Sequence, residues 1–178
     1  MKAQDILILL KLVALGKTPW NYRDLSSLIG LSISQLHSAI HRALDAKLAI
    51  NDNGDIFPNI LNLEEFLIHG LKYIFIPQTG EITRGFPTAY SAPPLDKLLT
   101  SSSESLPLIW PDPNGPVRGS SFAPIHKSAV KAAQSDQKLY ELLALVDAIR
   151  GGRVREQKIA KDALIERLHA YDQDAFKY

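Results

Sequence analysis

A short helix pattern, a glycine and a second helix pattern follow one another within residues 23–48, and this segment constrains the fold more than any other. The first pattern carries three apolar residues on one helix face: Leu25, Leu28 and Ile29. Gly30 allows the left-handed backbone that a tight turn needs, and Ser32 suits the N-cap of a second helix. The segment therefore predicts two helices that pack against each other across a sharp turn.

The second helix is expected to cover about residues 33–47 and to be amphipathic. Its apolar face consists of Leu36, Ile40, Ala43 and Leu44. Its N-cap and its polar face offer hydrogen-bonding groups: Ser32, Ser34, Gln35, His37, Ser38, His41 and Arg42. Amide and guanidinium groups can each form two hydrogen bonds with a base edge, and a serine can bind a base or a phosphate. We therefore take these seven residues as candidate DNA-binding residues of a helix that lies in the major groove.

A β-hairpin is predicted directly after this helix. Two strand-like runs, residues 48–50 and 55–57, flank the dipeptide Asn53-Gly54, which favours a tight turn with positive φ at both residues. Further helices are expected at residues 3–15 and 62–71; Asn62 and Glu65 have the spacing of a capping box at the start of the latter.

On these elements, residues 1–75 resemble the winged helix-turn-helix transcriptional regulators of the MarR-like type. The resemblance implies sequence-specific binding to double-stranded DNA and regulation of transcription. It has one departure, because the wing of that family usually carries a basic residue, whereas this wing carries Asp52 and Asp55. Acidic groups repel phosphate, so the wing is left out of the predicted site.

The distribution of charge along the chain favours DNA binding by a dimer. The net charge of the chain is only +1, but residues 1–50 carry six basic and three acidic side chains. Residues 51–75 carry four acids and one base. A module with so small an excess binds a polyanion weakly, so we expect a homodimer that reads two half-sites.

Proline dominates the region that follows, since nine of the eleven prolines lie within residues 77–124. Proline removes a backbone donor and disfavours helix at the preceding residue. An irregular, extended region without helices is therefore predicted for residues 76–134. Its apolar residues, among them Trp110 and Phe122, indicate that it packs on the fold.

The last predicted unit, residues 135–178, contains an αα-hairpin over residues 137–171. Two apolar stripes are interrupted at Gly151-Gly152 and consist of Leu139, Leu142, Leu143, Val146 and Ile149, then Ile159, Ala163, Leu164 and Leu168. We take this hairpin as the candidate dimer surface. The expected fold class is mainly α with a small β wing: an N-terminal winged helix, an irregular proline-rich middle region and a C-terminal helical hairpin.

Three blocks, residues 84–95, 110–119 and 139–153, resemble little-characterised bacterial helix-turn-helix proteins, some encoded beside nucleotidyltransferase-like toxin genes. This resemblance implies a regulator or an antitoxin. The alternative function is therefore an antitoxin or other protein-interaction module of a toxin-antitoxin-type operon, with a toxin or another operon-encoded protein as its partner.

Other functional classes lack a coherent pattern. With no cysteine the chain has no thiolate for zinc or for catalysis, and a reducing, cytoplasmic location is expected. His37 and His41 have chelating spacing but no evident further ligands, and no acid is placed to orient His126 toward Ser121. We therefore expect no enzyme activity, no catalytic or metal-binding residues, no cofactor and no membrane partner.

Overall fold

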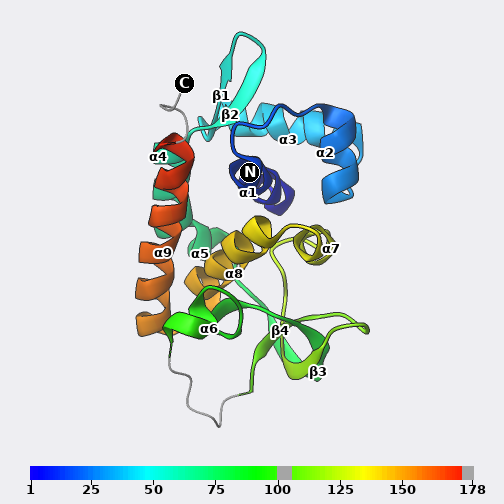
Figure 1. The fold of residues 1–178 in the computed structure, drawn as a ribbon, viewed down its shortest axis with the longest axis vertical. Helices are drawn as coiled ribbons and strands as arrows, with labels where there is room; N and C mark the ends of the chain where they lie inside the picture. The colour runs from blue at the N-terminus through cyan, green and yellow to red at the C-terminus, as the bar shows by residue number, and fades with distance from the viewer. Residues whose placement is uncertain (100–105, 174–178) are drawn as a thin grey trace.

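The computed structural model describes residues 1–99 and 106–173. One helix, α8 (Gln137–Gly151), lies at the centre, and α1, α5, α7 and α9 all contact it (Figure 1). Every residue from 142 to 150 is buried, including the charged Asp147 and Arg150. An apolar helix of this kind is covered on all sides by the rest of its own chain.

The C-terminal helical hairpin is confirmed, with α8 followed by α9 (Val154–Gln173). Its apolar stripes, however, face inward: Leu139, Leu143, Ile149, Leu164 and Leu168 have at most 1% of their surface exposed. The stripes that suggested a dimer surface are thus covered within one chain. They are therefore not available as a dimer surface. Dimerisation itself stays a prediction.

The N-terminal region contains α1 (Ala3–Leu15), α2 (Tyr22–Ile29) and α3 (Ile33–Asp45). Gly30 has φ 74° and ψ 33°, so the predicted left-handed turn between α2 and α3 is confirmed. An antiparallel hairpin of β1 (Ala49–Asp52) and β2 (Asp55–Pro58) follows. Asn53 and Gly54 have φ values of 54° and 102°, as expected for the turn.

The helix after the hairpin begins earlier than predicted. It consists of α4 (Ile60–Glu65), a π-helical turn (Phe66–Gly70) and α5 (Leu71–Ile74). The prediction of a capping box at Asn62 and Glu65 is wrong. Asn59 is the N-cap, and its side chain accepts a hydrogen bond from the Asn62 backbone. The Asn62 amide instead donates to the carbonyl of Lys47, which joins α4 to the end of α3.

The proline-rich middle region differs from the irregular chain that was expected. Three strands, β3 (Thr79–Pro87), β4 (Leu108–Pro111) and β5 (Val117–Phe122), form a small closed barrel in which each strand pairs with the other two. A 3-10 turn (Ala89–Ser91), α6 (Leu95–Leu98) and α7 (Ala129–Gln134) complete the region. Two of the prolines end β3 and β4, where a ladder hydrogen bond is not needed.

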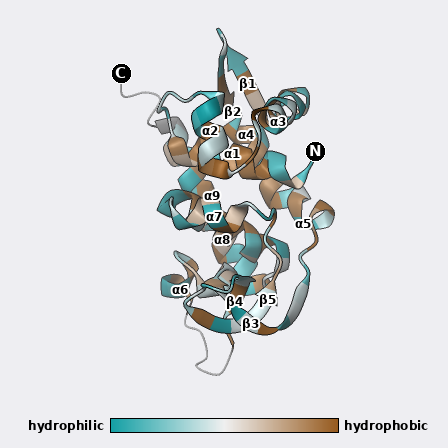
Figure 2. Cartoon of the chain, turned by 90° about the vertical axis from the view of Figure 1, so that its right-hand side faces the viewer, coloured by the Kyte–Doolittle hydropathy of each residue, from teal (hydrophilic) through white to brown (hydrophobic). Residues whose placement is uncertain are grey.

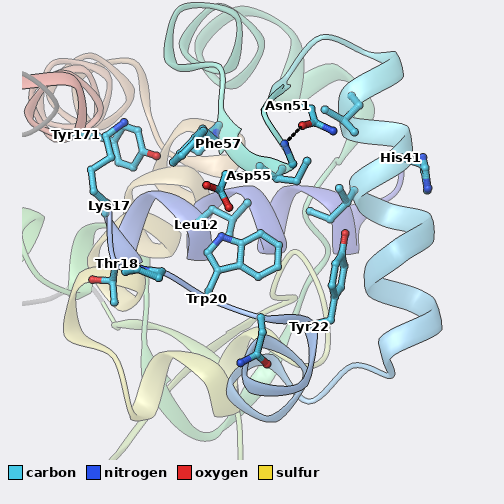
Figure 3. Close-up of a pocket in the computed structure, with 18 residues that line it drawn as sticks. Leu12, Lys17, Thr18, Trp20, Tyr22, His41, Asn51, Asp55, Phe57 and Tyr171 are labelled. Atoms are coloured by element: carbon cyan, nitrogen blue, oxygen red, sulfur yellow. Dashed lines mark hydrogen bonds between the residues drawn. The ribbon is translucent and has the colours of Figure 1, made fainter.

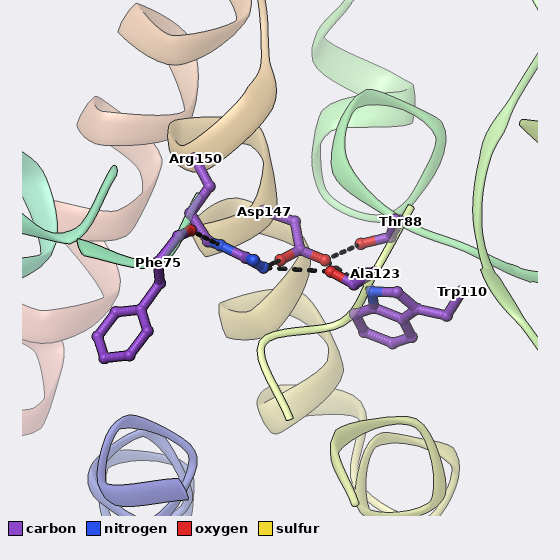
Figure 4. A network of polar contacts seen from close by, with 6 residues as sticks. All are labelled: Phe75, Thr88, Trp110, Ala123, Asp147 and Arg150. Atoms are coloured by element: carbon purple, nitrogen blue, oxygen red, sulfur yellow. Dashed lines mark hydrogen bonds and ion pairs between the residues drawn. The ribbon is translucent and has the colours of Figure 1, made fainter. Parts of the chain in front are cut away.

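A buried polar network fixes this barrel to α8 (Figure 4). The Asp147 carboxylate accepts hydrogen bonds from Trp110 Nε1 (2.6 Å), Thr88 Oγ1 (2.8 Å) and Arg150 Nη1 (2.6 Å). Arg150 Nε donates to the carbonyl of Phe75 at 2.8 Å. Burial raises the pKa of Asp147, while Arg150, Trp110 and Thr88 all favour its ionised form. The network ties the barrel and the end of α5 to the central helix.

The two β units lie at opposite ends of the molecule, with the helices between them, in both Figure 1 and Figure 2. Trp110 and Phe122 are each 1% exposed, so both side chains lie in the interior. No helix within the described residues is both long and apolar enough to cross a membrane.

Candidate nucleic-acid interface

The start of α3 is fixed by two of the predicted site residues. Ser32 Oγ accepts a hydrogen bond from the Gln35 backbone (3.2 Å), and Gln35 Oε1 accepts one from the Ser32 backbone (2.9 Å). This reciprocal pair is a capping box, which satisfies two backbone donors that the helix leaves without partners. The Gln35 amide group keeps its Nε2 donors, since only its oxygen is used.

His37 is held by an aromatic contact with α2. Its ring stacks on Tyr22 with centroids 3.8 Å apart and planes inclined by 17°. The contact fixes the orientation of the imidazole on the otherwise exposed face of α3. Burial raises the pKa of Tyr22, so its hydroxyl stays protonated and can donate a hydrogen bond.

Arg42 is half-buried and pairs with a carboxylate of α1. Its Nη2 and Nε donate to the Asp5 carboxylate at 2.6 and 2.9 Å, and the side chain of Asp5 is fully buried. The hydrogen bond to Asp5 raises the pKa of Arg42. Two donors of the guanidinium fork are thus committed to α1, and the pair sets how α3 lies against that helix.

Ser34, Ser38 and His41 form the free part of the polar face. All three are exposed, and none forms a side-chain hydrogen bond or ion pair with a residue that the structure describes. They are spaced by four and three residues, so they follow one stripe of α3. This stripe is where the helix can bind an external partner without breaking internal contacts.

Two basic residues that the sequence reasoning did not place in the site lie next to these elements. Arg23 is exposed in the first turn of α2, beside Tyr22, and Lys47 is exposed two residues after the end of α3, with φ 58°. Neither forms an ion pair with any described residue. The signal that could have identified Arg23 and Lys47 is the excess of basic residues in the first fifty positions.

The hairpin brings acidic groups to the same end of the molecule. Asp52 and Asp55 face each other across the turn in the β1–β2 register, and both are exposed. Their carboxylates oppose phosphate binding at the hairpin, in keeping with its omission from the predicted site.

The histidines show no metal-ligating arrangement. Within the described ranges, no group of three or more His, Asp or Glu side chains is placed to hold a metal ion. His126, the other candidate for chemistry, accepts a hydrogen bond at Nδ1 from the Ser128 backbone (3.1 Å). Burial and the nearby charge of Lys127 lower the pKa of His126.

No protein-family model, curated protein or solved structure matches this chain.

Proposed function

We propose that residues 1–75 form a winged helix that binds double-stranded DNA, and that the chain regulates transcription in the cytoplasm of a bacterial cell. The observation that carries this proposal is the exposed polar stripe of α3, presented after a tight glycine turn and followed by a hairpin. A recognition helix needs such a stripe at the surface, with its other face packed on a preceding helix.

The seven predicted residues take different roles in this proposal. Ser34, Ser38 and His41 contact base edges, together with the Nε2 donors of Gln35. Ser32 caps the start of α3, and His37 packs against Tyr22 of α2. Each can still contact the backbone of the DNA.

Arg42 acts mainly as a positioning residue, because Asp5 engages two of its donors. Arg23 and Lys47 supply the phosphate contacts that Arg42 does not.

A second copy of the chain completes the proposed site. A single module with few free basic groups binds DNA weakly, whereas two modules that bind half-sites about one helical turn apart gain affinity from each other. Selection of bound sequences from random DNA at 100 mM salt tests this directly. An enriched inverted repeat supports the proposal, and the absence of any enriched sequence contradicts it.

A matched pair of variants tests the role of α3. Gln35→Glu keeps an oxygen for the capping box, in which Glu is as suitable as Gln, but adds a negative charge to the DNA-facing side. We expect a loss of at least about tenfold in affinity for the selected site, measured by fluorescence anisotropy. Gln78→Glu makes the same chemical change at an exposed position directly before β3, outside α3 and the β1–β2 hairpin, and should leave the affinity within about twofold.

Equal DNA affinity of Gln35→Glu and the unchanged protein would contradict the assignment of α3 to the interface. Circular dichroism of both variants separates a loss of binding from a loss of fold.

A protein-interaction module, such as an antitoxin, is the second candidate. The observation that favours it is a run of exposed apolar side chains at the end of α5: Tyr73 (71% exposed), Ile74 (56%) and Ile76 (73%). Exposed apolar groups gathered in one segment are typical of protein-binding surfaces. Co-purification with the product of a neighbouring gene, combined with no salt-dependent retention on DNA, would favour this function over DNA binding.

A further inference from the structure

A cavity of about 440 Å³ lies at the hairpin end of the molecule (Figure 3). Its walls are the loop between α1 and α2, the second half of α3 and the β1–β2 hairpin, and Tyr171 from α9 closes one side. A volume of a few hundred cubic ångströms is within the range of small-molecule binding sites. The cavity borders the polar stripe of α3 at His41, which lines its edge, although the ring of His41 points away from its centre in Figure 3.

Four aromatic side chains from three parts of the chain line this cavity: Trp20 and Tyr22, Phe57, and Tyr171. Trp20 and Tyr22 meet edge to face, with centroids 5.4 Å apart and planes inclined by 74°. Trp20 and Phe57 are only half-buried, so a ligand can cover further area on both rings. The indole of Trp20 offers the largest ring face to such a ligand.

A carboxylate lies among these rings. Figure 3 shows the Asp55 side chain between Phe57 and Trp20. It forms no hydrogen bond or ion pair with any residue in the part of the chain that the structure describes. A carboxylate beside ring faces attracts a positive charge, because the faces of aromatic rings carry negative partial charge as well.

One ammonium group of the protein itself, that of Lys17, already lies over two of these rings. Lys17 Nζ lies 4.2 Å from the ring centroid of Tyr171 and 5.0 Å from that of Phe57. Both distances are within the range of a cation–π interaction. Lys17 lies on the Tyr171 side of the cavity, and Trp20 and Asp55 lie toward its middle (Figure 3).

We propose that the cavity binds a small planar organic cation, whose ring lies against Trp20 and whose cationic group pairs with Asp55. An anionic ligand could pair with Lys17, but its charge would then lie beside Asp55 and against the ring faces. For a cation the repulsion from Lys17 is opposed by both the carboxylate and the rings. This proposal does not rest on DNA binding, since Trp20 and Asp55 are not among the residues proposed to contact DNA.

Three probes with the same indole ring test the proposed charge preference: tryptamine, a cation at pH 7, neutral indole and the anion indole-3-acetate. Binding to the full chain is measured by isothermal titration calorimetry at pH 7 and low salt. We expect one tryptamine per chain, bound at least tenfold more tightly than indole or indole-3-acetate. Tighter binding of indole-3-acetate, or no binding of tryptamine, would overturn the proposal.

Two variants on the same hairpin locate the site. Asp55→Asn should weaken tryptamine binding at least tenfold and leave the weak binding of indole unchanged. Asp52→Asn is the matched control, because Asp52 is exposed opposite Asp55 but does not line the cavity, and it should bind tryptamine as the unchanged protein does. Equal tryptamine affinity for the two variants would overturn the assignment of Asp55, and circular dichroism verifies that both are folded.

Discussion

At the scale of single residues, the orientation of α3 depends on a charge pair that lies far apart in sequence. The fully buried Asp5 carboxylate accepts two hydrogen bonds from Arg42 and a third, of 2.7 Å, from the backbone of Lys2. A buried carboxylate that loses its partner is costly, because no water replaces the lost hydrogen bonds. The pair therefore stabilises the fold and at the same time fixes the polar face of α3.

Arg42→Met should lower the free energy of unfolding by about 3 kcal/mol, since it leaves the Asp5 charge buried without its partner. The double variant Asp5→Asn, Arg42→Met removes that charge and should recover part of the loss. Urea unfolding followed by circular dichroism measures both values. A double variant no more stable than Arg42→Met alone would show that the buried charge is not the cause.

A second residue, His126, makes stability depend on pH. Burial, with a smaller contribution from Lys127, lowers the pKa of His126 below its ordinary value of 6.5, and its Nδ1 accepts a hydrogen bond that requires the neutral ring. The unfolded chain then binds the proton more readily than the folded one. The stabilisation is complete above pH 6.5 and is lost as the pH falls through the lowered pKa.

We therefore expect the free energy of unfolding to rise as the pH increases toward 6.5, and His126→Gln to reduce that rise. Urea unfolding at several pH values measures the slope. His69→Gln is the matched control at an exposed position and should keep the slope of the unchanged protein. The same slope in both variants would contradict the role assigned to His126.

The sequence predicted the surface of the candidate site better than its internal contacts. Ser32 as N-cap and the exposure of Ser34, Ser38 and His41 follow from the periodicity of one helix, which is local information. The pairing of Arg42 with Asp5 depends on how α1 packs on α3, which periodicity does not reveal. A signal was present nonetheless, because a charged residue beside the apolar run 6–10 needs a partner once it is buried.

At the scale of elements, the β3–β5 barrel depends on glycines that permit backbones to approach closely. A Cβ at Gly119 would lie 2.1 Å from the carbonyl oxygen of Pro107, and one at Gly85 would lie 2.0 Å from that of Trp110. A Cβ at Gly80, by contrast, would lie 3.6 Å from the nearest atom, on Ser121. Only the first two positions leave no room for a side chain.

Gly119→Ala should therefore lower the free energy of unfolding by about 3 kcal/mol, because the methyl group forces β5 away from residue 107. Gly80→Ala adds the same methyl group in ordinary van der Waals contact and should change stability by less than about 1 kcal/mol. Thermal unfolding of the two variants compares them directly. Similar melting temperatures would show that the barrel can relax around the added group.

These glycines also explain why the barrel was not predicted. The helices α1, α3, α8 and α9 have regular apolar spacing, so the sequence predicted their presence well. The strands β4 and β5 are short, flanked by proline, and pair in parallel across an intervening turn. Their pairing depends on close backbone contacts between distant residues, which leave no periodic signal in the sequence.

At the scale of the whole molecule, α8 joins parts of the chain that the sequence divided into three units. It contacts α1 from the N-terminal region and packs beside the barrel through the Asp147 network. Lys11 in α1 also pairs with Asp136, the N-cap of α8, at 2.6 Å. Such shared contacts favour one cooperative unit over three independent ones.

We expect a single unfolding transition in urea. Trp20 lies near the hairpin and Trp110 in the barrel, so Trp20→Phe leaves a protein whose fluorescence reports on the barrel alone. Its fluorescence midpoint should agree with the midpoint from far-ultraviolet circular dichroism, to which all helices contribute. Two separate midpoints would instead support independent N-terminal and C-terminal units.

The central position of α8 also has a consequence during synthesis. Residues 6–14 of α1 are all buried in the finished protein, and part of that cover is α8, which is made more than a hundred residues later. At about 5 to 20 residues per second, the nascent chain carries this apolar helix without its final cover for roughly seven to thirty seconds. On the ribosome, α1 is thus an apolar helix to which a chaperone can bind.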